Sequence, residues 1–251
     1  MIASASTVAA PTALPVAIAA CGPAAVRVTG ATGDAERDWR TVHHLARRLT
    51  EQAPAGFLGC IPTYDAVLVE FDALEVDLAA MIPIVQEAAA GIDPDADLTE
   101  HPRHFEVPTA YGGEFGPDLD EVARITGIEP EDVIRLHTSP VYVVRCLGAP
   151  GGSPMLDGPA FPVPIPRLRS ARTHVPAGKV SVAGRQATIT PAAAPGGWLL
   201  IGATPLVLLD LEQNRPVPYL PGDTLSFHRI DEVEFRRLEG MRLTPAREAQ
   251  R

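Results

Sequence analysis

Positive charge and long apolar runs are both scarce in this 251-residue sequence, and each shortage excludes a class of function. Only 21 Lys and Arg residues face 31 Asp and Glu residues, which gives a net charge of −10 at pH 7. Because an acidic chain repels phosphate groups, we expect neither nucleic acid nor an anionic membrane as a partner. No apolar stretch reaches the roughly 20 residues that a membrane-spanning helix needs. We therefore expect a soluble protein.

Cysteine is also scarce, and its pattern argues against metal and disulfide chemistry. The three cysteines, Cys21, Cys60 and Cys146, are isolated and have neither the spacing of a zinc site nor that of a disulfide framework. The seven histidines include no pair at metal-ligand spacing, so we expect no metal site. The Ile18–Cys21 stretch resembles a lipoprotein cleavage box, but no basic residue precedes Arg27. We expect a cytoplasmic protein with reduced thiols, and a disordered tail over residues 1–15.

Proline and glycine are abundant, with 26 and 21 residues, which predicts many turns and short strands. Strand and helix patterns alternate over residues 16–110 in the order β-α-β-β-α-β, with Asp38–Gln52 and Leu78–Ala90 as the two amphipathic helices. This order predicts an N-terminal split-βαβ domain with both helices on one sheet face. The last strand of that domain is expected at His104–Thr109.

Residues 111–139 predict a connector of two short helices, one ending at Thr126 before Gly127 and one running from Glu129 to His137. The exposed positions of this hairpin are mostly acidic, which argues against a DNA-binding role. Residues 140–235 read as short strands separated by turns, with a Gly/Pro-rich loop at 148–166 and a strand at Leu206–Leu209. This pattern predicts a β-barrel, followed by a frayed, charged tail over residues 236–251.

The segments that are richest in Gly and Pro resemble the motifs of one family. They are Tyr111–Leu119 (YGGEFGPDL), His137 with Tyr142–Val144, Val175–Val180 (VPAGKV), Gly184 with Gln186 and Pro191, Pro195–Trp198, Leu200–Leu206 and Pro221–Asp223. Together they resemble the B subunit of the ATP-dependent 5-oxoprolinase, from about residue 16 to residue 230, with the spacing between motifs kept. This family includes sporulation kinase inhibitors and one part of the carboxyltransferase or allophanate hydrolase-like pair.

The resemblance implies an α+β fold whose C-terminal half is a cyclophilin-like β-barrel. It also implies two partners, a cyclophilin-like C subunit and an ATP-using A subunit, with which the chain opens the lactam of 5-oxoproline to glutamate. No cofactor is then bound by this chain, and ATP acts through one of the partners. Self-association of the barrel is the alternative to these partners.

One loop departs from the family pattern. Residues 148–156 read GAPGGSPML where the family typically has GFxPGFxYL, so two phenylalanines and a tyrosine are lost. Three hypotheses therefore stay open. The first is a 5-oxoprolinase-type hydrolase subunit. The second is a repurposed barrel that binds, cyclises or isomerises a less polar small molecule in specialised metabolism. The third is a non-enzymatic regulator of a kinase.

Three residues are candidates for catalysis, each with a structural alternative. His137 could act as acid or base, or could cap or pack its helix. Gln186 could orient a ligand carbonyl or bridge barrel strands. Lys179, the sole lysine, could be a desolvated amine or a solvated loop residue.

A second group of residues is expected to bind substrate, with Arg167 and Arg172 as anchors for an anion. The group comprises Arg167, Arg172, Gly178, Gly184, Gly197, Trp198, Gly152, Ser153 and Met155. Surface ion pairs are the alternative for the two arginines, and a place in the barrel core is the alternative for Trp198. We expect Glu114 and Asp118 to cap the helix that follows them.

Overall fold

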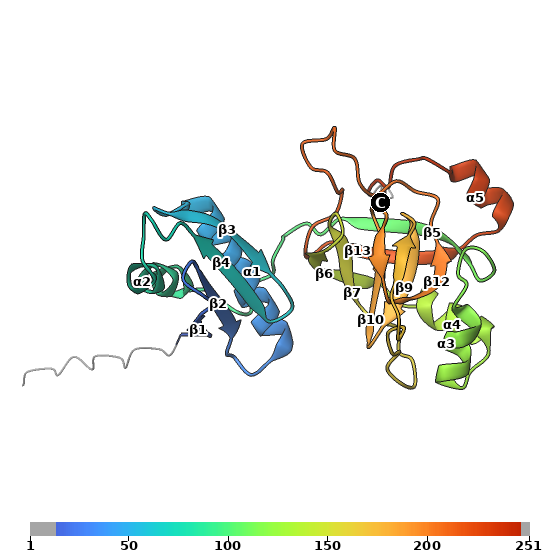
Figure 1. Ribbon diagram of the computed structural model, residues 1–251, viewed down its shortest axis with the longest axis horizontal. Coiled ribbons are helices and arrows are strands. Elements are labelled where there is room, and N and C mark those ends of the chain that lie inside the picture. Colours follow the sequence, from blue (N-terminus) through green and yellow to red (C-terminus); the bar gives the residue numbers. More distant parts are fainter. Residues whose placement is uncertain (1–13, 247–251) are drawn as a thin grey trace, which may run out of the picture. The chain divides into compact units, whose positions relative to one another are not determined.

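The computed structural model describes residues 14–246, and the chain divides into two compact units, Met1–Leu98 and Thr99–Arg251. Each unit has its own hydrophobic core. Residues 1–13 and 247–251, which belong to the two expected tails, lie outside the described residues. Figure 1 labels the elements of both units. No helix within residues 14–246 is both long and apolar enough to cross a membrane.

The N-terminal unit is a four-stranded antiparallel sheet in the order β1-β2-β4-β3. Its strands are β1 (Val16–Ala20), β2 (Ala25–Gly30), β3 (Phe57–Pro62) and β4 (Ala66–Phe71). Both β2 and β3 run antiparallel to β4, which lies between them, so β2 and β3 are parallel to each other. The connection from β2 through helix α1 to β3 is therefore the expected split-βαβ unit.

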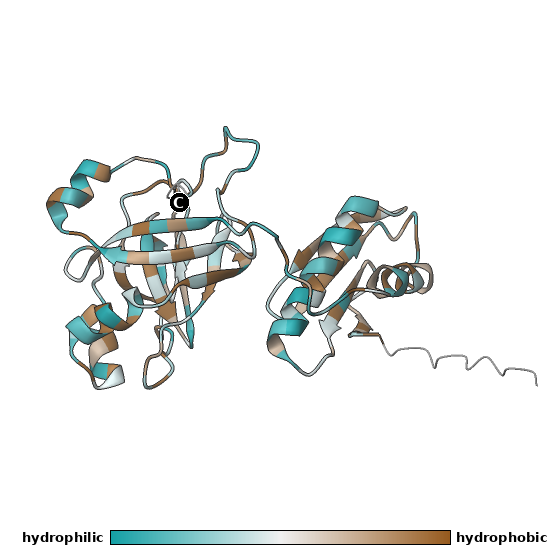
Figure 2. Ribbon diagram, turned by 180° about the vertical axis from the view of Figure 1, so that it is seen from behind, coloured by the Kyte–Doolittle hydropathy of each residue, from teal (hydrophilic) through white to brown (hydrophobic). Residues whose placement is uncertain are grey.

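Helices α1 (Ala35–Gln52) and α2 (Leu78–Ala89) pack against this sheet and against each other, so they cover the same face. The Asp34 side chain caps α1 by accepting a hydrogen bond of 2.9 Å from the backbone N–H of Arg37. Val42, Leu45 and Leu49 are buried on one side of α1. Figure 2 shows polar and apolar bands alternating along this helix, as the amphipathic pattern predicts.

The expected boundary at residue 110 is wrong, because strand β5 (His104–Tyr111) belongs to the second unit. It pairs in parallel with β13 (Thr224–Arg229) and antiparallel with β12 (Leu199–Ala203). In the N-terminal sheet, the hairpin partner β1 occupies the edge beside β2. A local hydrophobic pattern indicates that a strand forms, but it carries no information on which sheet the strand joins.

The second unit is a closed barrel in the order β10-β7-β6-β13-β5-β12-β9. Its further strands are β6 (Tyr142–Gly148), β7 (Ser153–Asp157), β9 (Lys179–Ala183) and β10 (Gln186–Ile189). Strands β8 (Arg172–Val175) and β11 (Ala194–Gly196) form a separate two-stranded sheet. The expected α+β fold with a C-terminal barrel is confirmed.

The helical hairpin is present as α3 (Leu119–Thr126) and α4 (Pro130–Thr138), and Gly127 ends α3 at φ 69° as expected. It forms part of the barrel unit, since both helices contribute buried side chains to the barrel core.

Three further expectations for the barrel unit are wrong. Strand β7 lies inside the stretch expected to be a loop. Leu206–Leu209 is not a strand, because only Val207 forms a bridge, to Arg242. The chain beyond residue 236 continues through α5 (Glu232–Leu238) to the buried Leu243.

Candidate functional site

The segment Tyr111–Asp118 contacts three of the residues predicted from the sequence, namely His137, Lys179 and Arg172. It runs over β12, where Asp118 N donates to Leu200 O (2.9 Å) and Gly112 N donates to Ile201 O (3.2 Å). A Cβ atom at Gly116 would lie only 1.9 Å from the Ile201 carbonyl oxygen, so this close approach requires glycine. We call Tyr111–Asp118 the crossing segment.

Asp118 binds Arg172 at one end of the crossing segment. Its Oδ1 accepts a hydrogen bond of 2.7 Å from Arg172 Nη2, and its Oδ2 accepts one of 2.7 Å from Leu200 N. The expected capping role is wrong for Asp118, since its side chain makes no cap bond to α3 although it stands at the N-cap position. The Glu114 carboxylate lies 3.6 Å from Arg236.

Arg172 retains an unpaired donor. Its Nη1 is buried and has no hydrogen-bond partner within residues 14–246, while Nη2 is held by Asp118. A buried N–H group without an acceptor is costly, and a charged one more so. The geometry therefore favours an acceptor, such as a carboxylate oxygen, at this position.

Arg167 and Trp198 lie together next to the two-stranded sheet of β8 and β11. The guanidinium carbon of Arg167 is 5.8 Å from the centroid of the Trp198 ring, a cation–π distance. Leu168 N donates to Gly197 O (2.8 Å), and Gly196 pairs with Arg172 between β11 and β8. The structure thus brings four predicted binding residues together, which we call the arginine cluster: Arg167, Arg172, Gly197 and Trp198.

His137 is fully buried among aromatic rings. Its Nδ1 shares a hydrogen bond of 2.8 Å with the Tyr111 hydroxyl, and the Tyr142 hydroxyl donates to the His137 carbonyl oxygen (2.8 Å). Burial lowers the pKa of His137 to about 3, so its imidazole is neutral at pH 7. Burial likewise raises the pKa of Tyr111. Nothing in this arrangement exposes His137 to a ligand, so we assign it the positioning of Tyr111.

A pocket of about 410 Å³ opens beside Tyr111. Its lining combines side chains of β5 and the crossing segment with those of the last residue of β13 and the three residues after it, namely Ala110, Tyr111, Phe115, Arg229, Ile230, Asp231 and Glu232. Arg229 is bound to Glu131 of α4 at 2.8 Å. This recess could hold a small molecule with one apolar face.

Lys179 fixes the middle of the crossing segment. Its Nζ donates to the carbonyl oxygens of Glu114 and Phe115, both at 2.8 Å. Burial lowers the pKa of the amine, and the nearby Glu114 carboxylate opposes that shift. In this position the lysine is a half-buried residue of β9 and not a solvated loop residue, and its role in catalysis stays a prediction.

The three candidate catalytic residues do not share one site. Gln186 begins β10 opposite Ala183, and Lys179 stands at the other end of β9, about 13 Å away at 3.3 Å per residue. Gly184 forms the turn between these strands at φ 58°, and Gly178 packs against the Thr204 carbonyl before β9. His137 lies on α4, which packs on β13, and β13 is not adjacent to β9 or β10.

The altered loop directs its polar atoms inward. Ser153 is buried and its hydroxyl donates to Pro150 O (3.1 Å), while Gly152 O accepts from the Tyr219 hydroxyl (3.0 Å). Met155 packs beside Gly148. These three predicted binding residues hold the β6–β7 turn in shape.

Sequence reasoning missed Tyr111, Phe115 and Asp118 as members of the site. The signal was present in the motif Tyr111–Leu119, but only Glu114 and Asp118 of this motif were given a role, as helix caps. Within residues 14–246 there is no group of three or more His, Cys, Asp or Glu side chains that could hold a metal ion.

The fold of this chain, a split-βαβ unit followed by a closed barrel, matches one class of known proteins. The family model described as "Carboxyltransferase domain, subdomain C and D" matches residues 16–219. A relative in Bacillus subtilis (strain 168), named as the B subunit of 5-oxoprolinase, is 40% identical over 204 residues, covering 77% of this chain and 84% of its own. The chain belongs to the family of 5-oxoprolinase B subunits.

Solved structures agree on the fold. The protein TTHA0988 is 30% identical with a TM-score of 0.70, and the match covers 83% of this chain but only 40% of that protein. The urea amidolyase of K. lactis aligns with a TM-score of 0.75 over 92% of this chain and 16% of its own, at 19% identity. The second likeness concerns the fold alone.

Proposed function

We propose that this chain is part of an ATP-dependent 5-oxoprolinase complex and that the arginine cluster holds the carboxylate of 5-oxoproline. The observation that carries the proposal is the buried, unpartnered Nη1 of Arg172, which lies on β8 opposite Gly196 of β11. Asp118 fixes the guanidinium through Nη2, so Nη1 is held ready for an anionic oxygen. The names of the relatives support the choice of substrate.

In the reaction, water adds to the lactam carbonyl carbon, the ring C–N bond breaks, and the nitrogen leaves as the amine of glutamate. This chain contributes positioning: Arg167 and Arg172 bind the carboxylate, and the Trp198 ring flanks Arg167. We assign ATP use to a partner, the A subunit, and completion of the site to a cyclophilin-like C subunit. The cellular compartment proposed for this complex is the cytoplasm.

The test is reconstitution of the chain with candidate A and C subunits. We expect native mass spectrometry to show a stable complex, and the complex to hydrolyse 5-oxoproline only with ATP. R167Q and R172Q should raise KM for 5-oxoproline by about 10- to 100-fold, because each removes a charge-assisted hydrogen bond. R169Q, a nearby exposed arginine outside the cluster, is the matched control and should leave KM unchanged.

A chain that forms no complex and is inert to 5-oxoproline would overturn this proposal. One observation then favours the repurposed barrel, namely that residues 148–156 lack the two phenylalanines and the tyrosine typical of the family, while Ser153 and Gly152 are bound by other groups of the chain. If the chain instead binds and inhibits a kinase, the regulatory hypothesis would stand.

A further inference from the structure

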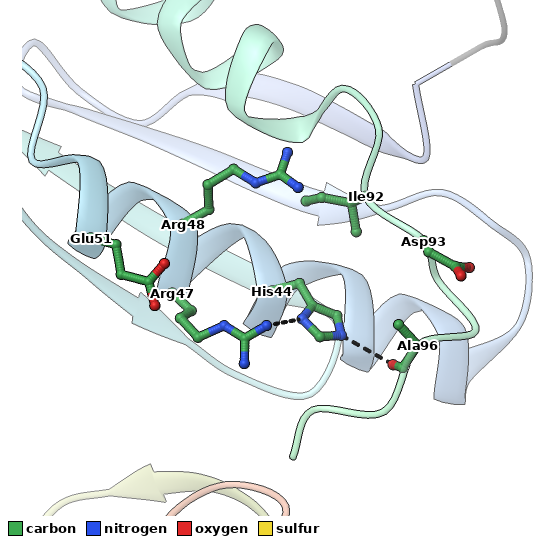
Figure 3. A pocket seen from close by; sticks show the side chains of 7 residues that line it. All are labelled: His44, Arg47, Arg48, Glu51, Ile92, Asp93 and Ala96. Atoms are coloured by element: carbon green, nitrogen blue, oxygen red, sulfur yellow. Dashed lines mark hydrogen bonds between the residues drawn. The ribbon is translucent and has the colours of Figure 1, made fainter. Parts of the chain in front are cut away.

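The N-terminal unit contains a pocket of about 350 Å³ that is separate from the arginine cluster (Figure 3). One wall is the face of α1 that carries His44, Arg47, Arg48 and Glu51, and the other is the segment with Ile92, Asp93 and Ala96. On α1 the pocket residues occupy positions 44, 47, 48 and 51. Each is three or four positions from another, so all four lie on one helix face. The pocket has the size expected of a small-molecule site.

Backbone carbonyls hold both arginines of the pocket in place. Arg47 Nη1 donates to Leu98 O (3.1 Å) and its Nη2 donates to His44 Nδ1 (2.9 Å). Arg48 Nη1 donates to Ala88 O (2.6 Å) and to Ala90 O (2.8 Å). Each guanidinium therefore uses two of its five N–H donors on the protein and keeps the others.

The His44 ring completes this rigid wall. Its Nε2 lies 3.0 Å from the Ala96 carbonyl oxygen, which can only accept, while its Nδ1 receives the Arg47 donor. These two partners select the neutral imidazole with the proton on Nε2. The ring thus links α1 to the opposite wall of the pocket (Figure 3).

Neither Arg47 nor Arg48 has a carboxylate partner within residues 14–246. The arginines nearer the start of α1 differ, since Arg37 pairs with Asp95 (3.1 Å) and Arg40 pairs with Glu36 (3.4 Å). The acidic side chains that line the pocket, Glu51 and Asp93, form no ion pair with Arg47 or Arg48. The pocket therefore presents separate positive and negative groups whose formal charges balance.

We propose that this pocket binds a free α-amino acid as its zwitterion. The guanidinium N–H groups that Arg47 and Arg48 keep free fit carboxylate groups of the ligand, and the Glu51 carboxylate on the same helix face fits its ammonium group, whereas Asp93 lies at the opposite end of the pocket (Figure 3). A simple anion would meet the two acidic side chains, and a simple cation would meet the two arginines. The buried Ile92 offers an apolar wall to the aliphatic part of the ligand.

The candidate amino acid is L-glutamate, an assignment that rests on the proposed function. 5-Oxoproline has a lactam nitrogen without positive charge, and the ammonium group exists only after the ring is opened. Glu51 would therefore distinguish the product of the reaction from its substrate. A site of this kind, remote in sequence from the arginine cluster, would sense accumulated product.

Isothermal titration calorimetry on the full chain without its partners tests the proposal. L-Glutamate should bind with a dissociation constant on the order of 1 mM or tighter. Glutarate, which lacks the ammonium group, 5-oxoproline and inorganic phosphate should each bind at least about tenfold more weakly. Equal binding of phosphate, or no heat with glutamate, would overturn the proposal.

Variants identify the site independently of activity. E51Q changes an exposed side chain that forms no ion pair or side-chain hydrogen bond within residues 14–246, and it should weaken glutamate binding by about tenfold without altering glutarate binding. R48Q should abolish binding of both ligands, and circular dichroism checks that it folds. R27Q, an exposed arginine on β2 in the same unit, is the control and should bind glutamate like the native chain.

The experiment separates the two proposals. If the reconstituted complex hydrolyses 5-oxoproline but glutamate does not bind this pocket, the amino-acid site is disproved and the proposed function stands. If hydrolysis is absent and glutamate still binds in a way that depends on Glu51, the site stands and the proposed function fails.

Discussion

The two units of the chain use polar side chains in different ways. In the N-terminal unit, the core cluster is apolar, and arginines hold surface segments through backbone carbonyls. The buried polar side chains of that unit are Thr41 and His43, whereas both buried carboxylates of residues 14–246, Asp118 and Asp223, lie in the barrel unit together with the fully buried His137. The residues of the candidate site in the barrel therefore also stabilise the barrel, whereas those of the pocket in the N-terminal unit can be altered with less effect on folding.

The sharpest test of this comparison is Asp118→Ala. It removes the acceptor of both Arg172 Nη2 and Leu200 N, and so leaves a charge and an N–H group unpaired. We expect a loss of about 3–5 kcal/mol in the free energy of unfolding of the barrel, measured by urea denaturation. The exposed Asp120→Ala on the same helix is the control and should change stability by less than about 1 kcal/mol. Equal effects would break the comparison.

Leu45→Ala tests the N-terminal unit, whose stability should depend on apolar packing. Leu45 is fully buried, so its truncation should cost about 2–4 kcal/mol. The chain has two tryptophans, Trp39 in this unit and Trp198 in the barrel unit, so W198F and W39F chains report each unit by fluorescence. Only the Trp39-reported transition should move, and Leu58→Ala, an exposed residue of the same unit, should leave it in place. A shift of both transitions by Leu45→Ala would contradict the prediction.

His137 makes the stability of the barrel depend on pH. Its pKa is about 3 in the folded chain and 6.5 in the unfolded chain. Between pH 3 and pH 6.5 the unfolded state therefore binds one more proton than the folded state. The contribution of the neutral His137 to the free energy of unfolding is therefore complete above pH 6.5. It falls by about 1.4 kcal/mol per pH unit as the pH is lowered toward 3. Urea titrations from pH 7 to pH 4, read from Trp198, should show a flatter dependence for H137Q. The exposed His101→Gln should keep the native slope.

Lys179→Met is expected to give the smallest of these effects. It removes the two hydrogen bonds to the Glu114 and Phe115 carbonyls but leaves the aliphatic part of the side chain. Burial of the Lys179 charge already costs free energy, so removing the charge offsets part of the lost hydrogen bonding. We therefore expect the free energy of unfolding of the barrel, measured by urea denaturation, to fall by about 1 kcal/mol. Arg124→Met, which breaks an exposed pair with Glu121, should have no measurable effect. A loss as large as that of Asp118→Ala would show that Lys179 is central to the fold.

Local signals in the sequence predicted most elements correctly. The amphipathic spacing of Leu78–Ala90 marked α2 although Pro83 lies inside it, and Gly127 marked the end of α3. Local pattern failed where pairing is distant. The partner of β5 and the absence of a strand at Leu206–Leu209 depend on neighbours far along the chain.

The site was predictable by residue type but not by arrangement. Arg167 lies over the Trp198 ring and Arg172 pairs with Gly196 of β11, but their role in binding substrate stays a prediction. His137, Lys179 and Gln186 do not meet, because motif spacing fixes no position around a closed barrel. The contact between Arg172 and Asp118, 54 positions apart, carries no signal that a single sequence reveals.

The parallel pairing of β5 with β13 also sets an order of events during synthesis. His104 and Thr224 are 120 positions apart, and the other neighbour of β5, β12, begins only at Leu199. The first barrel strand to leave the ribosome therefore waits, with both edges unpaired, until nearly the whole chain has emerged. A chain that stops before Thr224 has no closing strand, so its first strand is an open edge for aggregation.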